Sequence, residues 1–242
     1  MESSKFIIPN WPAPNNVKSI QTTRLGGVSM TPYDSLNFGM HVKDNPLHVA
    51  RNRQLLSQFL PSEPVWLNQV HGVNVLDAST ANCVPEADAS FTIKKNVVCI
   101  TMTADCLPVL LCNQQGTIVA SIHAGWRSLC DGVIEATVEK MGIQPSDLMA
   151  WLGPAIGPQA FEVGSEVRAQ FIAADKPSQV AFMPHGEKWL ANIYTIARQR
   201  LSHLGVSQIY GGGLCTYTDQ VHFFSFRRDG DTGRMATMIW LE

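Results

Sequence analysis

Three short segments each place a metal-binding side chain beside glycine or proline. His71 lies in WLNQVHG, Cys106 in TMTADCLPVLL and His123 in SIHAGWRS. We expect each at a strand end, where glycine leaves space for a ligand. Two imidazoles and one thiolate suit a borderline-soft cation such as zinc, and three protein ligands leave a fourth position for water. The ion lowers the pKa of that water to ~7, so the pattern predicts a catalytic metal site.

Two other interpretations use the same residues. Cys106 could be a nucleophile that His123 or His71 activates, with Asp105 orienting the base or withdrawing a proton. Alternatively, the histidines are ordinary hydrogen-bonded side chains and Cys106 is a core thiol. A closed structural site needs a fourth ligand, but six residues of strand span ~20 Å, so the other nearby cysteines, Cys99 and Cys112, cannot readily share the ion. Stoichiometric zinc would favour the metal site, and full activity after chelation would favour the nucleophile.

Further residues are candidates for the surroundings of this site. Gln69 and Asp105 flank the proposed ligands and could orient them or transfer protons. Arginine grips phosphate or carboxylate in a bidentate manner, and the free N–H groups at a helix start also attract anions. The expected substrate- or phosphate-binding residues are Arg24, Asn37, Arg127, Arg227 and Arg228, and the aromatic residues that could stack a base are Trp126, Phe223 and Phe224.

Composition narrows the class of protein. The net charge of −2 gives no general attraction to nucleic acid or to an anionic membrane, so we expect a small-molecule substrate. No stretch approaches the ~20 apolar residues of a membrane span. The N-terminal segment lacks the basic start and apolar middle of a signal peptide. We therefore expect a cytoplasmic protein whose six cysteines are thiols or ligands. The sequence identifies no partner protein.

Hydrophobic spacing predicts an α/β (α+β) fold, with a single domain over residues 1–242 and helices packed outside mixed β-sheets. Residues 20–42 read as an ordered loop rich in Gly, Ser, Thr and Asn. The predicted helices cover 46–60, 128–141, 165–174 and 188–204, with stops at Gly142 and Gly205. The predicted strands lie near 65–70, 73–77, 97–102, 107–112 and 117–123, followed by two C-terminal strands in FFSFRRDG and MATMIWL.

These motifs together resemble the YfiH family, also called DUF152 or the polyphenol oxidase (laccase) family. Its members are described as purine nucleoside phosphorylase and adenosine deaminase and, in bacteria, as peptidoglycan editing factor. The similar segments cover nearly the whole chain and include TRLGGVS, SLNFGMHV, NQVHG, TADCLPVLL, HAGWRS, WLGPAIGP, FEVG, GGLCTYTD and FFSFRRDGDTGRMA.

The resemblance implies a layered α/β sandwich and metal ligands at His71, Cys106 and His123. The implied metal is zinc, with copper in the oxidase description. The implied activities are phosphorolysis of adenosine, inosine and methylthioadenosine, and deamination of adenosine. Many members carry Cys-Cys after GPAIGP where this chain has Gln159-Ala160, so a catalytic or redox role for those cysteines is not expected here.

Chemistry ranks these activities. A zinc-bound hydroxide suits deamination, and arginines suit phosphate in phosphorolysis. Multicopper oxidases use His-x-His pairs, whereas this chain has seven histidines and no such pair. A single copper on the same donors remains compatible with weak oxidase activity. The alternative hypotheses are a hydrolase that edits nucleotide-linked muropeptide precursors and a non-catalytic metal-stabilised binding module.

Overall fold

The computed structural model describes residues 5–81 and 83–242. Two β-sheets, one of four strands and one of six, pack face to face: strands β5 and β13 of the smaller sheet contact β7 of the larger sheet. The four-stranded sheet has the order β1 (Phe6–Ile7), β2 (Val17–Thr22), β13 (Met235–Leu241), β5 (Cys99–Thr103), all antiparallel. The six-stranded sheet has the order β12 (Gln208–Gly211), β8 (Leu148–Leu152), β6 (Leu107–Asn113), β7 (Val119–Ala124), β4 (Ala89–Thr92), β3 (Val75–Asp77).

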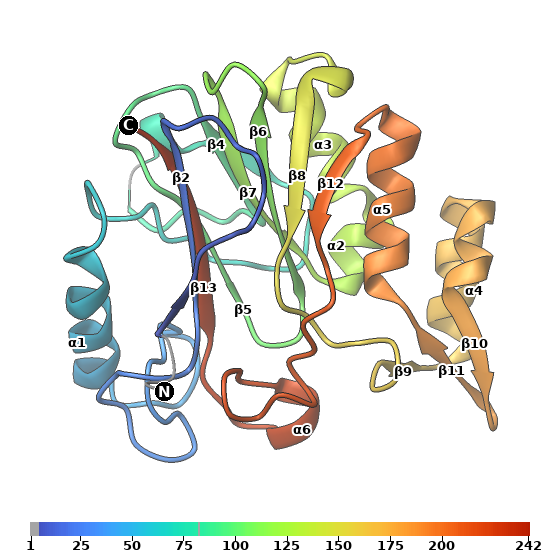
Figure 1. The fold of residues 1–242 in the computed structure, drawn as a ribbon. Coiled ribbons are helices and arrows are strands. Elements are labelled where there is room, and N and C mark those ends of the chain that lie inside the picture. The colour runs from blue at the N-terminus through green and yellow to red at the C-terminus, as the bar shows by residue number, and fades with distance from the viewer. Residues whose placement is uncertain (1–4, 82) are drawn as a thin grey trace.

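The larger sheet is mixed, as the sequence predicts. The pairs at its two edges, β12 with β8 and β3 with β4, are parallel, whereas the central pairs are antiparallel. A separate hairpin sheet has the order β10 (Phe182–His185), β11 (Lys188–Ala191), β9 (Glu162–Val163). Figure 1 shows α1 on the outer side of the smaller sheet and α5 on the outer side of the larger one.

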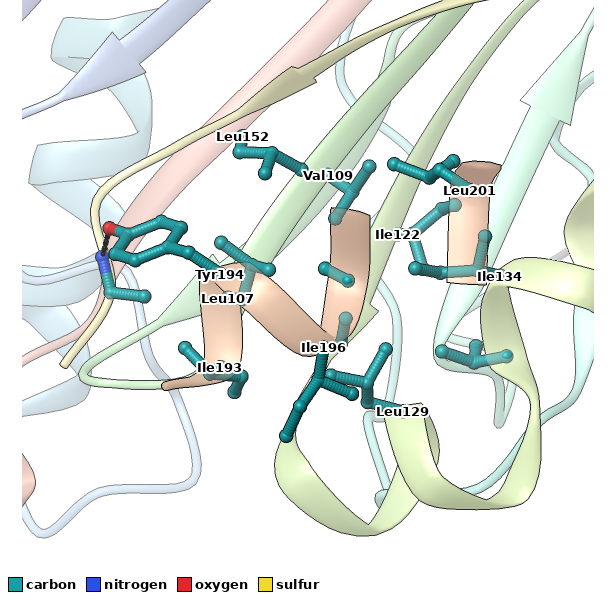
Figure 2. Packing of buried hydrophobic residues seen from close by; sticks show 14 of the residues in the cluster. Leu107, Val109, Ile122, Leu129, Ile134, Leu152, Ile193, Tyr194, Ile196 and Leu201 are labelled. Atoms are coloured by element: carbon teal, nitrogen blue, oxygen red, sulfur yellow. Dashed lines mark hydrogen bonds between the residues drawn. The ribbon is translucent and has the colours of Figure 1, made fainter. Parts of the chain in front are cut away.

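Helices cover the outer faces of both sheets. Leu56 of α1 (Pro46–Ser57) packs with Ile100 and Trp240 on the smaller sheet. On the larger sheet, Leu107 and Val109 meet apolar residues of α5 (Ile193–Leu204), as Figure 2 shows. The remaining helices are α2 (Trp126–Asp131), α3 (Val133–Met141), α4 (Ser165–Ala174), the short α6 (Phe226–Asp229), and the 3-10 turns η1 (Ala78–Thr80), η2 (Pro145–Asp147) and η3 (Lys176–Ala181). The layered α/β architecture predicted from the sequence is confirmed.

Several predicted helices have different limits. The helix expected over 128–141 is two helices, because Gly132 adopts φ +97° between them. The helix expected from 188 begins only at Ile193: the side chain of Asn192 caps it, and the four residues 188–191 form strand β11. The helix expected over 46–60 ends at Ser57.

Two strand predictions and one loop prediction also need correction. Residues 65–70 form only isolated bridges, at Val65 and Asn68. The segment FFSFRRDG is not a strand: the Ser225 hydroxyl accepts a hydrogen bond from Arg228 N and starts the short helix α6. The loop expected over 20–42 begins only after β2 ends at Thr22. The bridges of residues 65–70 and the pairing of β2 with β13 are contacts with distant parts of the chain, which local spacing does not encode.

Candidate metal and anion site

The three predicted ligands come together, although they come from different parts of the fold. His123 lies near the end of β7, Cys106 directly precedes β6, and His71 lies in a turn. One donor atom from each lies within 4.8 Å of the other two, and the three residues form the one such group of His, Cys, Asp and Glu donors found among the described residues. Cys106 Sγ is 3.7 Å from His71 Nε2. This group could hold a metal ion.

A buried carboxylate, Asp88, orients both histidines. Asp88 Oδ1 accepts a hydrogen bond from His123 Nδ1 at 2.8 Å, which leaves Nε2 of that ring for the ion. Asp88 also accepts the N–H groups of Val70, His71 and Gly72, at 3.2, 3.0 and 2.7 Å. These bonds hold His71 in the left-handed conformation, at φ 60°. The sequence analysis missed Asp88 because nothing in its local spacing links it to either histidine.

The electrostatics of the group favour the ionised thiol. Burial alone would raise the pKa of Cys106, but the charge and hydrogen bonds of His123 and His71 outweigh burial and lower it. Burial alone would lower the pKa of His123, but the Cys106 thiolate and Asp88 outweigh it and raise it. For Asp88, burial acts to raise the pKa, and the bonds from His123 and Gly72 hold it below its ordinary value. The thiolate is the form of cysteine that binds metals.

Gly125 gives the donors their space. A Cβ atom added at this position would lie 2.8 Å from His71 Cδ2 and 3.1 Å from Cys106 Sγ. Gly125 is the N-cap residue of α2, so the helix starts directly against the donor group. The donor types, the orienting carboxylate and this clearance all fit a metal ion with three protein ligands.

The donor group opens into a cavity of about 480 Å³. Its lining includes the predicted residues Gln69, Asp105, Arg127 and Arg227, and also Trp126, together with residues that the sequence analysis missed: His41, Thr103, Ile156, Phe161, Ile193, Phe226 and Arg234. Because three guanidinium groups and one carboxylate face this space, it carries an excess of positive charge and suits an anion. His41 and Arg234 lie in segments quoted for the family resemblance, which was the available signal.

Gln69 and Asp105 both hold backbone in place. The Gln69 amide donates to Met102 O at 2.8 Å and accepts from Met102 N at 2.7 Å. Asp105, at φ 91°, accepts the Thr216 hydroxyl and the backbone N–H of Arg227, both at 2.6 Å. These contacts position the cavity wall and the first turn of α6. A proton-transfer role for either residue stays a prediction.

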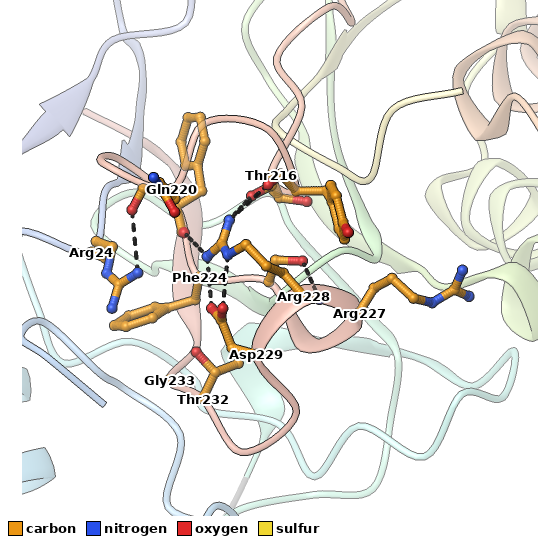
Figure 3. A network of polar contacts seen from close by, with 12 residues as sticks. Arg24, Thr216, Gln220, Phe224, Arg227, Arg228, Asp229, Thr232 and Gly233 are labelled. Atoms are coloured by element: carbon orange, nitrogen blue, oxygen red, sulfur yellow. Dashed lines mark hydrogen bonds and ion pairs between the residues drawn. The ribbon is translucent and has the colours of Figure 1, made fainter. Parts of the chain in front are cut away.

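The other predicted residues lie elsewhere. Arg24 and Arg228 line a separate polar groove of about 310 Å³, where both guanidinium groups donate hydrogen bonds to backbone carbonyl oxygens (Figure 3). Asn37 is fully buried and accepts the N–H groups of Gly39 and Arg234, so it supports the cavity without lining it. Of the predicted stacking residues, Trp126 lines the cavity, whereas Phe223 and Phe224 are core residues at 1% and 0% exposure.

Fold and donor set define a class of α/β proteins in which two packed sheets and adjoining loops bring together three donors that could hold a metal ion, beside a cavity lined by arginines. The family model described as "Multi-copper polyphenol oxidoreductase laccase" matches residues 18–242. The chain therefore belongs to this family, which is the YfiH or DUF152 family that the sequence motifs resemble.

Individual relatives agree over nearly their full lengths. The chain is 56% identical to "Purine nucleoside phosphorylase YfiH" of Escherichia coli, covering 98% of this chain and 99% of that protein. It is 50% identical to a purine nucleoside phosphorylase of Pseudomonas aeruginosa, covering 98% of each. A crystal structure of a Neisseria meningitidis DUF152 protein superimposes with a TM-score of 0.96 at 47% identity, covering 99% of this chain and 100% of that one. Within the described residues, no helix is both long and apolar enough to cross a membrane.

Proposed function

We propose that this chain is a metal-dependent purine nucleoside phosphorylase that also deaminates adenosine. The observation that carries the proposal is one cavity that contains the three-donor group and is lined by three arginines and by aromatic and aliphatic side chains. An anion and a flat heterocycle both find complementary surfaces there. The names of the curated relatives, purine nucleoside phosphorylases at 56% and 50% identity, support the same activity.

Phosphorolysis joins a phosphate oxygen to the anomeric carbon of the ribose while the glycosidic C–N bond breaks. The electron pair of that bond leaves with the purine, which takes up a proton. Arg127, Arg227 and Arg234 would hold the phosphate charge through this step, and Asp105 would fix the turn that carries Arg227. Zinc, when bound by the three donors, supplies a Lewis acid and a water of lowered pKa, which is the chemistry that adenosine deamination requires.

Oxidase chemistry has weaker support. Multicopper oxidases need several copper ions, and the described residues contain one group of three such donors. The hydrolase alternative would place a substrate diphosphate against the same arginines. Incubation with a nucleotide-linked muropeptide, beside inosine plus phosphate, separates that alternative from phosphorolysis.

The test joins metal analysis to turnover. The purified chain should contain one zinc per molecule, release hypoxanthine from inosine only when phosphate is present, and release ammonia from adenosine. Cys106→Ala should lose the metal and both activities. Cys83→Ala is the matched control, because Cys83 is an exposed free thiol outside the donor group. Full turnover by metal-free Cys106→Ala would refute the proposal.

A further inference from the structure

One histidine in the cavity wall, His41, has no acidic partner among the described residues. The chain has seven histidines, and each of the other six lies beside a carboxylate or a thiol. Their partners, in chain order of the histidines, are Asp44, Cys106, Asp88, Glu162, Asp175 and Asp219. His41 is solvent-accessible and lines the cavity, so a ligand can reach its ring.

The loop that carries His41 is held beside Arg234. Phe38 N donates a hydrogen bond to Arg234 O at 3.1 Å. The Asn37 side chain accepts the N–H groups of both Gly39 and Arg234, each at 2.9 Å. Arg234 lines the same cavity and is one of the three arginines proposed to hold phosphate. These bonds therefore place the imidazole next to the expected position of the anion.

The ring of His41 is neutral at pH 7. Partial burial lowers its pKa below the ordinary value, and the nearby charged groups of Arg234, His123, Arg53 and His71 lower it further. A neutral imidazole carries a proton on one nitrogen and a lone pair on the other. It can therefore accept one proton and donate another, and it ends the transfer with the charge it had at the start.

The other titratable groups of the cavity wall are less suited to move a proton. His71, Cys106 and His123 are the proposed metal donors. Each carboxylate oxygen of Asp105 already accepts a hydrogen bond, and that residue is only 9% exposed. Arginine side chains keep their protons. Within the described lining, His41 is thus the group that can both take up and release a proton.

Phosphorolysis moves a proton as well as breaking and making bonds. The phosphate dianion enters with one proton, and the sugar phosphate leaves as a dianion without it. A phosphate oxygen bonds to C1′ while the C1′–N9 bond breaks, and the purine leaves with that electron pair and gains one proton. The reaction therefore balances when the proton of the phosphate is replaced on the purine.

We propose that His41 relays this proton, because one ring nitrogen accepts it from phosphate while the other donates a proton to the leaving purine. The inference rests on the proposed function, since it takes phosphate and a purine nucleoside as the reactants. His41 is then a catalytic residue, and its effect depends on how strongly the leaving purine needs a proton.

The test compares two nucleosides at saturating phosphate on the metal-loaded chain. Inosine releases a purine that needs a proton, whereas 7-methylinosine already carries a positive charge and releases a neutral purine without one. His41→Gln, whose amide cannot carry a proton, should lower kcat for inosine by about 100-fold and change kcat for 7-methylinosine by less than about threefold.

His203→Gln is the matched control, because that exposed histidine pairs with Asp175 outside the cavity. It should leave kcat unchanged for both nucleosides. All three proteins should contain the same amount of zinc and have similar unfolding midpoints. In His41→Ala, added imidazole should restore inosine turnover by at least about tenfold, because the small base replaces the missing ring.

Three results would overturn the inference alone. They are unchanged inosine turnover by His41→Gln, an equal loss for both nucleosides, and loss of zinc from His41→Gln, which would make the residue a metal donor. If the unsubstituted chain does not accept 7-methylinosine, the imidazole experiment decides, and no restoration in His41→Ala overturns the relay. If the unsubstituted, metal-loaded chain releases no hypoxanthine from inosine and phosphate, the proposed function fails and this inference fails with it.

Discussion

The two arginine-lined hollows of the molecule use the same side chain in opposite ways. In the groove, Arg228 donates to the carbonyl oxygens of Thr216, Tyr217 and Phe223 and pairs with Asp229. In the cavity, Arg127 stacks on Trp126, with its guanidinium carbon 4.4 Å from the ring centroid. The side chains of the groove arginines donate through most of their nitrogens to the fold. In the cavity, within the described part of the chain, the Arg227 side chain donates through Nη1 alone, to Ala160 O and Glu162 O. Figure 3 shows Arg227 extending away from the Arg228 network.

The difference shows that the acceptors around an arginine decide whether its guanidinium group is bonded within the fold or is available to a ligand. Arg24 resembles Arg228, because its three nitrogens contact Asp34 and Gln220 O. Arg234 is half-buried, and among the described residues its guanidinium group donates through Nη1 alone, to Thr232 O and Gly233 O. Substitutions in the groove should therefore change stability, and substitutions in the cavity should change catalysis.

The largest effect is expected in the groove. Arg228→Gln should lower the free energy of unfolding by about 3 kcal/mol, because several carbonyl oxygens and Asp229 lose a charged partner. Urea denaturation measures the change. The folded fraction of this variant should keep the KM for phosphate of the original chain. A large rise in that KM at unchanged stability would make Arg228 a ligand-binding residue and break the comparison.

In the cavity, Arg127→Ala should lower kcat/KM for phosphate by about 100-fold, because it removes a charged donor to the transferring anion. Steady-state kinetics with inosine and varied phosphate measure the loss, and the unfolding midpoint should stay close to that of the original chain. Arg24→Ala is the matched control. It should keep the phosphate kinetics and lose about 1 kcal/mol of stability, because its ion pair is partly exposed. The reverse pattern would contradict the assignment.

A smaller effect is expected at Asp88, which hydrogen-bonds two of the three donor residues. Asp88→Asn should weaken zinc binding by about tenfold, because an amide orients His123 less firmly than a carboxylate and can no longer hold the turn at His71 in the same way. Competition with a chromogenic chelator measures the affinity. Asp147→Asn, at a half-exposed carboxylate in η2 outside the donor group, is the control. Equal zinc affinity in all three proteins would remove Asp88 from the metal site.

The sequence predicted the donor group well because residue chemistry is nearly independent of the fold: few side chain types bind zinc. It also predicted most helices, because their caps and stops are local. The sequence could not show that Arg127 lines the cavity whereas Arg228 is bonded within the fold. The Arg228 side chain donates to the carbonyl oxygens of residues 216 and 217, which lie in another segment of the chain. Asp88 was missed for the same reason, because its partners lie 16 or more residues away.

Gly125 is both the N-cap residue of α2 and the residue that leaves space for the donor group, because it has no side chain. Any larger residue there would force the imidazole of residue 71 or the sulfur of residue 106 aside before a cation arrived. A relative that carries another residue at this point of its sequence should therefore have lost the ion even if all three donors remain. The residue at position 125 should thus distinguish relatives whose donor group has room for an ion from relatives whose donor group does not.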